Sequence, residues 1–575
     1  MEDKTSKNNG VDNSEAKEDT ELVKDVDYDQ LLSAAGEFGR YQVYLFFLMG
    51  PFYIFGVFSY FSQLFLTEVS PNHWCRIPEL ENLTLIERRE LAIPTDNSIF
   101  GYSRCTEFVA NWTEVLASGI KPNDTWGTQS CQHGWEFNQT EIPYPTISSE
   151  LGWVCDRASY QATAQSIFFV GSIIGGFIVG WIADRFGRLP AAVVSNLIGC
   201  VAGVGSTFAQ NFLVFTICRF FMGMSYDNCM MMIYLLVLEY VAPKYRTIMA
   251  NLSFSIFFTL GVCALPWIAL ACNHWQITSL VTSIPLALAV LTPFVTPESP
   301  RWLMSKGRYD DAIKKAQNIS KVNKKEIPMK LIEQFKLSVM KSKNQTDQHN
   351  TIIDLLKRPL LRRMLFCMSL EFFCAMIVYD ALVRTIGQLE FDFFLSFTII
   401  SFTELPSLVL LSFILDWFGR KWLTIIAMFV CGIFSLITPF VGGGLASVLC
   451  SVVARFGVNM VMNACMQWAA EMFPAQVRGT ATSIVHICGF TAMVISPYVP
   501  YLNTIQPWLP LVLVGCMAIF AALLCFSLPE TANKVMPQTF EDAEELMRSQ
   551  VMWDMPCIKK KSLDNAHVNS SFEMS

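Results

Sequence analysis

Long runs of apolar residues constrain this chain more than any other feature. Twelve such runs are separated by polar segments. A helix of about 20 residues crosses the hydrocarbon core of a bilayer, and it satisfies its own backbone hydrogen bonds there. The pattern therefore predicts an all-α membrane protein with twelve transmembrane helices. The predicted helices cover residues 41–66, 160–183, 190–209, 212–238, 248–271, 276–296, 364–386, 392–415, 422–441, 445–468, 481–502 and 508–528.

The composition agrees with a place in the lipid bilayer and argues against several other classes of protein. Only 16% of the residues are charged, whereas soluble proteins carry about 25%. The net charge of −7 leaves no basic domain for nucleic-acid phosphates. The sequence contains no phosphate-binding glycine loop, metal-ligand cluster or nucleophile motif. It therefore predicts no enzymatic activity, no cofactor, no metal site and no nucleic-acid partner.

The helices fall into two groups of six around a basic stretch at residues 297–363, which holds sixteen Lys or Arg. The segment at residues 67–157 holds only six. Because basic loops stay on the cytoplasmic side, we expect the stretch inside and the segment outside. Residues 158–296 then contain helices two to six, and residues 364–528 contain helices seven to twelve.

Both ends of the chain are expected in the cytoplasm. The first 37 residues hold eleven acidic side chains and four Lys, so residues 1–40 are predicted to form a disordered acidic tail. This tail lacks the basic region and cleavage site of a secretory signal, so it should stay where it starts. Residues 529–575 form the second tail.

The outside segment carries two signs of an oxidising, glycosylated compartment. An even number of cysteines in one polar loop predicts two disulfides, with three pairings open. These cysteines are Cys75, Cys105, Cys131 and Cys155. Four glycosylation triplets cluster in the same segment, at Asn82, Asn111, Asn123 and Asn138. The segment is therefore predicted to be an extracellular glycoprotein loop of a plasma-membrane protein.

One turn motif occurs twice, after the second and the eighth predicted helices. It reads Asp184-Arg185-Phe186-Gly187-Arg188 in the first half and Asp416-Trp417-Phe418-Gly419-Arg420 in the second. The glycine permits a sharp turn, and the Asp and Arg can form charge-assisted hydrogen bonds between helix ends. Two copies in register indicate an internal repeat of six helices with a latch on each cytoplasmic face.

Further motifs follow one another along the chain. They are Gly36-Glu37-Phe38-Gly39-Arg40, Pro71-Asn72-His73-Trp74-Cys75-Arg76, Leu151-Gly152-Trp153-Val154-Cys155-Asp156-Arg157, Pro297-Glu298-Ser299-Pro300-Arg301, Glu471-Met472-Phe473-Pro474 and Leu528-Pro529-Glu530-Thr531. With the two turns, they make the chain resemble the major facilitator superfamily, and within it the organic cation, anion and zwitterion (carnitine) transporters. This resemblance implies a substrate site near the bilayer midplane, exposed to either side by rocking of the two halves. Many of these relatives have six cysteines in the outside loop, so the number of bridges here stays open.

Ionisable residues inside the helices are the candidate substrate ligands, because a charge in hydrocarbon is costly. Asp227 stands where cation-transporting relatives commonly have Lys. Its carboxylate either receives a substrate ammonium, or pairs with Arg219, or is protonated. Asp380 and Glu404 add two more acids, and Glu371 precedes Phe372 in helix seven.

Aromatic and basic residues complete the candidate site. The resemblance places Tyr379 and Glu404 on the cavity wall and Phe372 where relatives often have Trp. An aromatic face with a carboxylate suits a substituted ammonium. Arg455 either neutralises one of the acids or binds a substrate carboxylate. His486 and Phe490 share one face of helix eleven, where a histidine either packs or makes uptake depend on pH.

Charged residues near the helix ends are predicted to latch helices rather than to bind substrate. The resemblance assigns this role to Arg219, Glu239, Glu471 and Arg478, besides the two turn motifs.

The acids outnumber the bases among these candidates, so the sequence favours alternating-access transport of small organic cations or amine-bearing solutes. A second reading is ion-coupled transport of a zwitterion of the carnitine or β-amino-acid type, with its carboxylate on Arg455. A third is a cell-surface receptor that does not transport.

Overall fold

The computed structural model describes residues 26–96, 101–119, 122–123, 125–342 and 352–549. Most of the predicted N-terminal tail and residues 550–575 therefore lie outside the described part. Eleven described helices are long and apolar enough to cross a membrane, and α24 is a shorter apolar helix. These twelve confirm the predicted all-α membrane fold.

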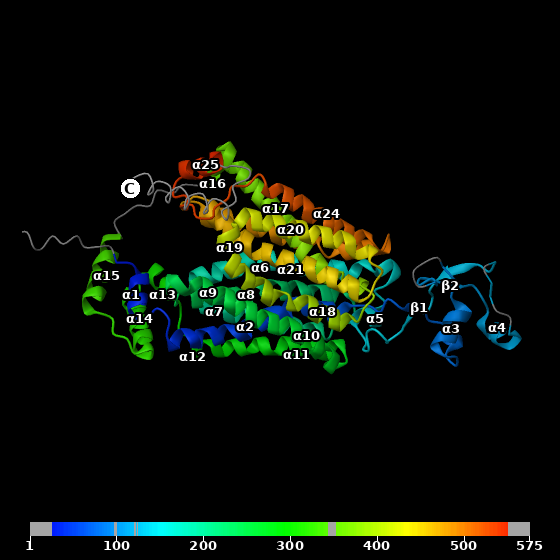
Figure 1. The fold of residues 1–575 in the computed structure, drawn as a ribbon. Helices are drawn as coiled ribbons and strands as arrows, with labels where there is room; N and C mark the ends of the chain where they lie inside the picture. Colours follow the sequence, from blue (N-terminus) through cyan, green and yellow to red (C-terminus); the bar gives the residue numbers. More distant parts are fainter. Residues whose placement is uncertain (1–25, 97–100, 120–121, 124, 343–351, 550–575) are drawn as a thin grey trace, which may run out of the picture.

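The helices form two halves that lie side by side, blue to green and yellow to red in Figure 1. The first half consists of α2 (Arg40–Thr67), α6 (Ser159–Phe186), α7 (Arg188–Ser206), α8 (Phe212–Leu238), α9 (Pro243–Ser253) continued by η3 (Phe254–Phe258) and α10 (Thr259–Cys272), and α11 (Trp275–Ser283) continued by η4 (Ile284–Leu291) and α12 (Thr292–Val295). The second consists of α17 (Pro359–Arg384), η5 (Ile386–Gln388), α18 (Phe393–Phe402) with α19 (Glu404–Phe418), α20 (Arg420–Ile437) with η6 (Thr438–Phe440), α21 (Leu445–Met472), α22 (Arg478–Ile495) with α23 (Tyr498–Tyr501) and η7 (Leu502–Thr504), and α24 (Leu509–Cys525).

Small residues allow the helices of the first half to pack closely. A Cβ on Gly171 of α6 would lie 2.1 Å from the backbone oxygen of Phe220, and one on Gly223 of α8 would lie 1.9 Å from that of Phe168. Only glycine fits at these two crossings, so α6 and α8 meet backbone to backbone.

The eighth membrane helix is interrupted where the sequence places a carboxylate. α18 ends at Phe402 and α19 begins at Glu404, with Thr403 between them. Pro406 has no N–H to continue the helical ladder, which explains a break at this point. The interruption sets Glu404 at the first turn of a new helix in the middle of the membrane span.

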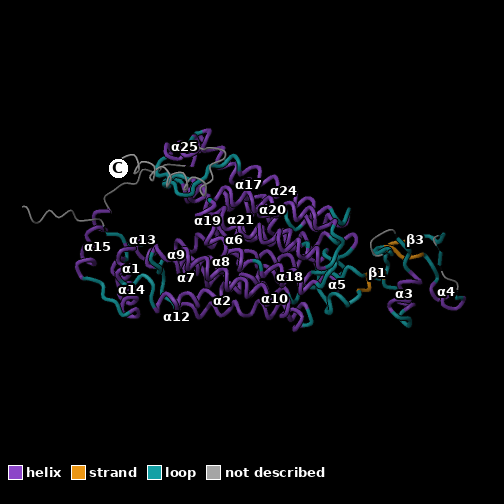
Figure 2. The backbone as a smooth tube through the Cα atoms, in the orientation of Figure 1, coloured by secondary structure: helices purple, strands orange, loops and turns teal. Residues whose placement is uncertain are grey.

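The described residues between 68 and 158 form a small domain at one end of the bundle, which we call the loop domain (Figure 2). Two antiparallel strand pairs join β1 (His73–Cys75) to β4 (Trp135–Phe137) and β2 (Thr106–Phe108) to β3 (Thr128–Ser130). The remaining elements are η1 (Pro78–Leu80), α3 (Leu85–Ala92), α4 (Trp112–Ser118), α5 (Ile147–Leu151) and η2 (Cys155–Arg157). Two disulfides, Cys75–Cys131 and Cys105–Cys155, confirm the predicted number of bridges and select one of the three pairings. We call this end of the bundle the domain end.

The opposite end carries the two Gly-Arg turns, and we call it the motif end. Its short helices are α1 (Tyr28–Ala34), α13 (Pro300–Ser305), α14 (Tyr309–Asn323), α15 (Met329–Ser342), α16 (Ile352–Lys357) and α25 (Phe540–Arg548). Helix α1 differs from the expected disordered tail. Tyr28 and Leu31 are buried in a core with Ile313 and Phe335 of α14 and α15. One apolar face of a single short helix is enough to order this part of the tail once tertiary partners cover it.

Candidate functional site

Three of the predicted site residues form one buried cluster in the second half. Arg455 of α21 donates to Glu404 Oε1 at 2.9 Å, and the Tyr379 hydroxyl of α17 donates to the same oxygen at 2.9 Å. The guanidinium carbon of Arg455 lies 3.6 Å from the centre of the Tyr379 ring, and the Nη1–H group donates to the Tyr379 backbone oxygen. Glu404 and Arg455 are 3% and 1% exposed. Of the two roles that the sequence left open for Arg455, neutralisation of an acid is the one present in this conformation.

Asp380 is also neutralised, at the domain end of α17. Its Oδ2 accepts from Arg384 Nε at 2.7 Å, one helical turn further along. Its Oδ1 accepts a short hydrogen bond from the hydroxyl of Tyr60, which belongs to α2 in the other half. Asp380 is 1% exposed. This carboxylate therefore joins the two halves rather than standing free in a cavity.

Asp227 differs from these acids because no hydrogen bond or ion pair joins its side chain to another residue in the described part of the chain. It lies midway along α8 and is half-buried, unlike its fully buried neighbours Tyr226 and Asn228. The group that acts on its charge is His486 of α22, in the opposite half. The Phe490 ring packs on His486 with 4.9 Å between ring centres. Asp227 thus presents between the halves a carboxylate that forms no hydrogen bond or ion pair among the described residues.

Aromatic side chains pack around Tyr226, the neighbour of Asp227 in α8. Tyr60 stacks on Tyr226 with ring centres 5.0 Å apart, and Phe168 lies 5.5 Å from Tyr226. Met224 and Met230 of α8 flank Asp227 in sequence and are mostly buried. Methionine adapts its shape to different ligands, and aromatic faces attract cations. The sequence analysis missed Tyr60, because one tyrosine in a helix rich in aromatics carries no distinguishing signal.

Two other predicted residues lie inside the packing of the second half. Glu371 is 0% exposed, and the Cys465 thiol lies 3.2 and 3.1 Å from its two oxygens. Phe372 is 1% exposed and packs against α22, where a Cβ on Gly489 would lie 2.5 Å from its ring.

Arg219 of α8 does not latch helix ends. It is 1% exposed, with its guanidinium 4.7 Å from the Phe168 ring centre and one weak hydrogen bond, 3.4 Å long, to the Ser59 backbone oxygen. Within the described residues no carboxylate lies within ion-pair distance of it. It adds a buried positive charge to the domain side of the first half.

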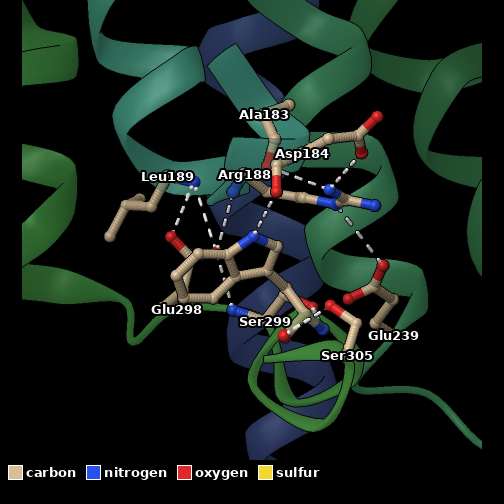
Figure 3. A network of polar contacts seen from close by, with 9 residues as sticks. Ala183, Asp184, Arg188, Leu189, Glu239, Glu298, Ser299 and Ser305 are labelled. Atoms are coloured by element: carbon tan, nitrogen blue, oxygen red, sulfur yellow. Dashed lines mark hydrogen bonds and ion pairs between the residues drawn. The ribbon is translucent and has the colours of Figure 1, made fainter. Parts of the chain in front are cut away.

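Figure 3 shows the latch of the first half at the motif end. Arg188 pairs with Asp184 at 2.9 Å and with Glu239 at 3.9 Å. Glu298 accepts from the backbone N–H groups of Arg188 and Leu189 at 2.9 and 3.1 Å. Burial raises the pKa of Glu239 to about 7, against the opposing effect of Arg188. Arg188 and three carboxylates thus tie together the ends of α6, α7 and α8 and the segment that follows α12.

The second half repeats these contacts. Arg420 pairs with Asp416 at 2.8 Å and with Glu471 at 2.9 Å, and Glu530 accepts from the backbone N–H groups of Arg420 and Lys421 at 3.0 and 3.1 Å. Sequence reasoning missed Glu298 and Glu530 as latch residues. The signal was present, because a Pro-Glu-Ser/Thr tripeptide follows the last helix of each half.

The turn glycines and the remaining predicted latch residues have distinct roles. Gly187 and Gly419 have φ angles of +113° and +86°, which favour glycine. The Arg185 side chain lies over the Trp181 ring at 5.5 Å and is exposed. Arg478 donates to the backbone oxygens of Phe473 and Pro537, at 3.2 Å each. Arg185 therefore stays outside the latch, and Arg478 holds chain ends rather than Glu471.

The hydrogen bonds that cross between the halves in the described part lie from the bilayer middle toward the domain end. Besides Tyr60 and Asp380, Thr163 bonds Tyr498 at 3.1 Å. Phe65 of α2 packs on Phe397 of α18 with ring centres 5.0 Å apart. Each latch at the motif end, by contrast, bonds within its own half. The halves are thus fastened to each other at the domain end.

Comparisons with known proteins agree with this architecture. The model of the family described as sugar (and other) transporter matches residues 128–546. The carcinine transporter of Drosophila melanogaster is 29% identical over 90% of this chain and 79% of its own. The beta-alanine transporter of the same organism is 29% identical over 90% and 89%, and organic cation transporter 1 of Caenorhabditis elegans is 29% identical over 91% and 89%. The inward open structure of the xylose transporter XylE from E. coli has a TM-score of 0.56, with 16% identity, over 87% of this chain and 99% of that one, and shows the same fold.

Proposed function

This chain belongs to the sugar (and other) transporter family, where its relatives include organic cation transporters, and on that premise we propose that it carries small organic cations or amine-bearing solutes through the site at Asp227. The observation that carries the proposal is the carboxylate of Asp227, half-buried between the halves without a partner in the described residues. A substrate ammonium supplies the missing positive charge.

The charges around the site support a cation over a zwitterion. Glu404 with Arg455, and Asp380 with Arg384, form ion pairs that cancel within the protein. Glu371 is enclosed against the Cys465 thiol inside the second half, whereas Asp227 is the half-buried acid that forms no ion pair among the described residues. A substrate carboxylate bound to Arg455 would have to displace Glu404 from a contact of 2.9 Å.

A zwitterion is the second candidate, and the beta-alanine transporter among the relatives favours it. Its ammonium would bind Asp227. Arg219, which has no carboxylate partner among the described residues, is a basic group available to such a substrate in the same helix. Eight residues along a helix span about 12 Å, so this arrangement suits a zwitterion with well-separated charges.

The orientation in the membrane follows from the loop domain. Two disulfides and four glycosylation triplets favour an oxidising exterior, so the domain end faces outside and the motif end faces the cytoplasm of a plasma-membrane carrier. With the halves joined at the domain end, the conformation described here is closed to the outside. Rocking about the site at Asp227 exchanges this closure for one at the motif end.

Transport without chemical conversion is the corresponding activity. The predicted glycosylated asparagines lie in the loop domain, where Asn82, Asn111 and Asn123 are exposed and Asn138 is half-buried. The asparagines carry glycans on the outer surface of the carrier, and the latch residues hold helix ends together during its motion.

Uptake of labelled amines, zwitterions and organic anions by cells expressing the full chain tests the proposal. Saturable amine uptake that falls on depolarisation with external potassium supports a cation, because a single charge gains about 2.3 kcal/mol per 100 mV. Uptake that ignores potential and requires sodium or a proton gradient supports the zwitterion instead. Absence of saturable uptake for all three classes contradicts transport.

A further inference from the structure

The end of α14, at the motif end in Figure 1, lies against the start of the first membrane helix, α2. Asn323 Oδ1 accepts from the backbone N–H of Tyr41 at 3.0 Å, and Asn323 Nδ2 donates to Gln42 Oε1 at 3.0 Å. A Cβ on Gly36 would lie 3.5 Å from Lys325 Cγ. Because the predicted membrane span begins at Tyr41, these contacts place the turn after α14 where α2 enters the bilayer.

The turn after α14 has a fixed backbone. Lys324 ends the helix with a φ angle of +55°. The backbone N–H of Lys325 donates to the Ser320 backbone oxygen at 3.0 Å, and the Ser320 hydroxyl donates to the Lys325 backbone oxygen. The lysines of this turn therefore extend from a backbone whose shape is set by the protein itself.

Four basic side chains occupy this place, and we call them the basic turn. They are exposed, and none of them forms an ion pair within the described residues. They are the three turn lysines, Lys321, Lys324 and Lys325, and Arg40, the first residue of α2. Arg40 lies between Gly39 and Tyr41, which both approach Asn323.

Acidic side chains close by in sequence do not cancel the charge of the basic turn. Glu37 is 3.5 Å from the Lys244 ammonium, which offsets it. Glu326, directly after the turn, is exposed and forms no ion pair among the described residues. One such carboxylate leaves an excess of positive charge at this point of the surface.

Exposed apolar side chains lie next to the basic turn on the membrane side. Val43 and Phe47, in the first two turns of α2, are 43% and 63% exposed. Phe38, just before α2, is 49% exposed, and its ring centre lies 5.3 Å from that of Tyr245. Apolar residues at such positions of a membrane helix contact acyl chains, and aromatic rings at the helix end lie among the headgroups. A molecule with an anionic head and acyl chains matches both surfaces.

We propose that the basic turn binds the headgroup of an anionic phospholipid, whose acyl chains lie along Val43 and Phe47. The lysine ammonium groups and the Arg40 guanidinium donate to the phosphate oxygens. The bound lipid connects α14 to the first membrane helix and holds the short helices of the first half at the bilayer surface. Only the choice of the cytoplasmic leaflet rests on the proposed function, through the orientation given there.

The acidic tail at residues 1–25 is the other occupant with complementary charge, because it holds eight acids and four lysines. It is the poorer match for two reasons. It has no acyl chains to cover Val43 and Phe47, and a peptide loses backbone entropy of about 1–2 kcal/mol for each residue that it orders. An anionic lipid already lies in the adjacent leaflet and pays neither cost.

Thermal unfolding of the purified full chain in a neutral detergent measures the binding, since a ligand of the native state raises the unfolding temperature. Dioctanoylphosphatidylglycerol should act at concentrations at least about tenfold lower than dioctanoylphosphatidylcholine, which has the same chains and no net charge. Glycerol 3-phosphate, a soluble anion without chains, should need at least about tenfold more than the phosphatidylglycerol. The advantage of phosphatidylglycerol should shrink as the salt rises from about 0.05 to 0.5 M.

Variants test whether the basic turn is responsible. Glutamine at the three turn lysines should raise the required phosphatidylglycerol concentration at least about tenfold. The matched control combines Lys306→Gln, Lys314→Gln and Lys336→Gln, which remove the same charge from exposed positions of the same region and should change it less than about threefold. Arginine at the three turn lysines keeps the charge and should retain the binding, which separates loss of charge from misfolding.

Equal responses to the two phospholipids, an equal response to glycerol 3-phosphate, or equal losses in the glutamine variant and its control overturn the lipid site. The tail is tested in the full chain with Glu15→Gln, Glu18→Gln and Glu21→Gln. If the parent protein ignores phosphatidylglycerol and this variant responds to it, the tail occupies the basic turn and the proposal is overturned. Failure of amine uptake contradicts only the proposed function, because the unfolding measurement involves no transport.

Discussion

The hydroxyl of Tyr60 in the first membrane helix donates a hydrogen bond to the carboxylate of Asp380 in the seventh, across the boundary between the two halves. Asp380 is simultaneously paired with Arg384, so a single buried carboxylate receives a donor from each half. Opening the domain end requires the Tyr60 bond to break, while the bond within α17 can persist.

Tyr60→Phe should therefore favour opening at the domain end. A hydrogen bond to a charged group contributes about 1.5–3 kcal/mol, so the ratio of open to closed molecules should rise about tenfold or more. Spin labels at positions 208 and 440, exposed on opposite halves near this end, should report a larger population of long distances.

Tyr234→Phe is the matched control, because the Tyr234 hydroxyl makes no hydrogen bond in the described residues and the ring is half-buried. If both variants leave the distance distribution of the parent protein unchanged, the contact between Tyr60 and Asp380 does not hold the domain end closed.

Asp227→Asn should lower amine uptake about tenfold or more at equal surface expression, roughly 1.4 kcal/mol, because the amide keeps the size and removes the charge. Asp227→Glu keeps the charge and should retain part of the uptake. Initial rates with a labelled amine measure both. Undiminished uptake by the amide variant would assign Asp227 a purely structural role.

Glu404 and Arg455 should behave as a unit. Removing one partner of a buried ion pair costs about 3–5 kcal/mol, because the other charge stays buried without compensation. Glu404→Gln or Arg455→Gln alone should reduce the thermal stability of the purified protein, and the double variant should recover part of the loss. Strictly additive losses would show that the 2.9 Å contact contributes nothing beyond its parts.

Deglycosylation should lower the apparent mass of the protein from cells. Replacing the four acceptors together by Gln should abolish this shift, since they are the triplets of the loop domain. The acceptors are Asn82, Asn111, Asn123 and Asn138. A shift that persists on a gel would place an acceptor elsewhere and contradict the proposed orientation.

The twelve-helix fold could be predicted from sequence because membrane insertion depends on local hydrophobicity, which each apolar run carries by itself. The pairing of the buried charges could not be predicted from the sequence. Arg455 and Glu404 are 51 residues apart, and their contact depends on how α19 and α21 are rotated and spaced. Asp227 and Glu404 looked alike in sequence, and only the three-dimensional arrangement shows that one is paired and the other is not.

The short helices and turns at the motif end also depend on contacts that the sequence alone does not predict. Helix α1 has too few residues to be stable alone, and its order comes from α14 and α15, which follow about 280 residues later in the chain. Glu298 and Glu530 bind backbone N–H groups, which every residue has, so no side-chain pattern identifies their partners.

The hydrogen bonds that anchor the loop domain run to the first half. Tyr144 donates to the backbone oxygen of Phe65, Ser148 donates to that of Thr67, and Glu150 accepts from the indole of Trp275. The loop domain should therefore move together with the first half during the transport cycle. An antibody fragment that binds only the loop domain should leave the transport cycle intact. A fragment that also binds residues 441–444 of the second half should hold the two halves in a fixed arrangement and stop transport.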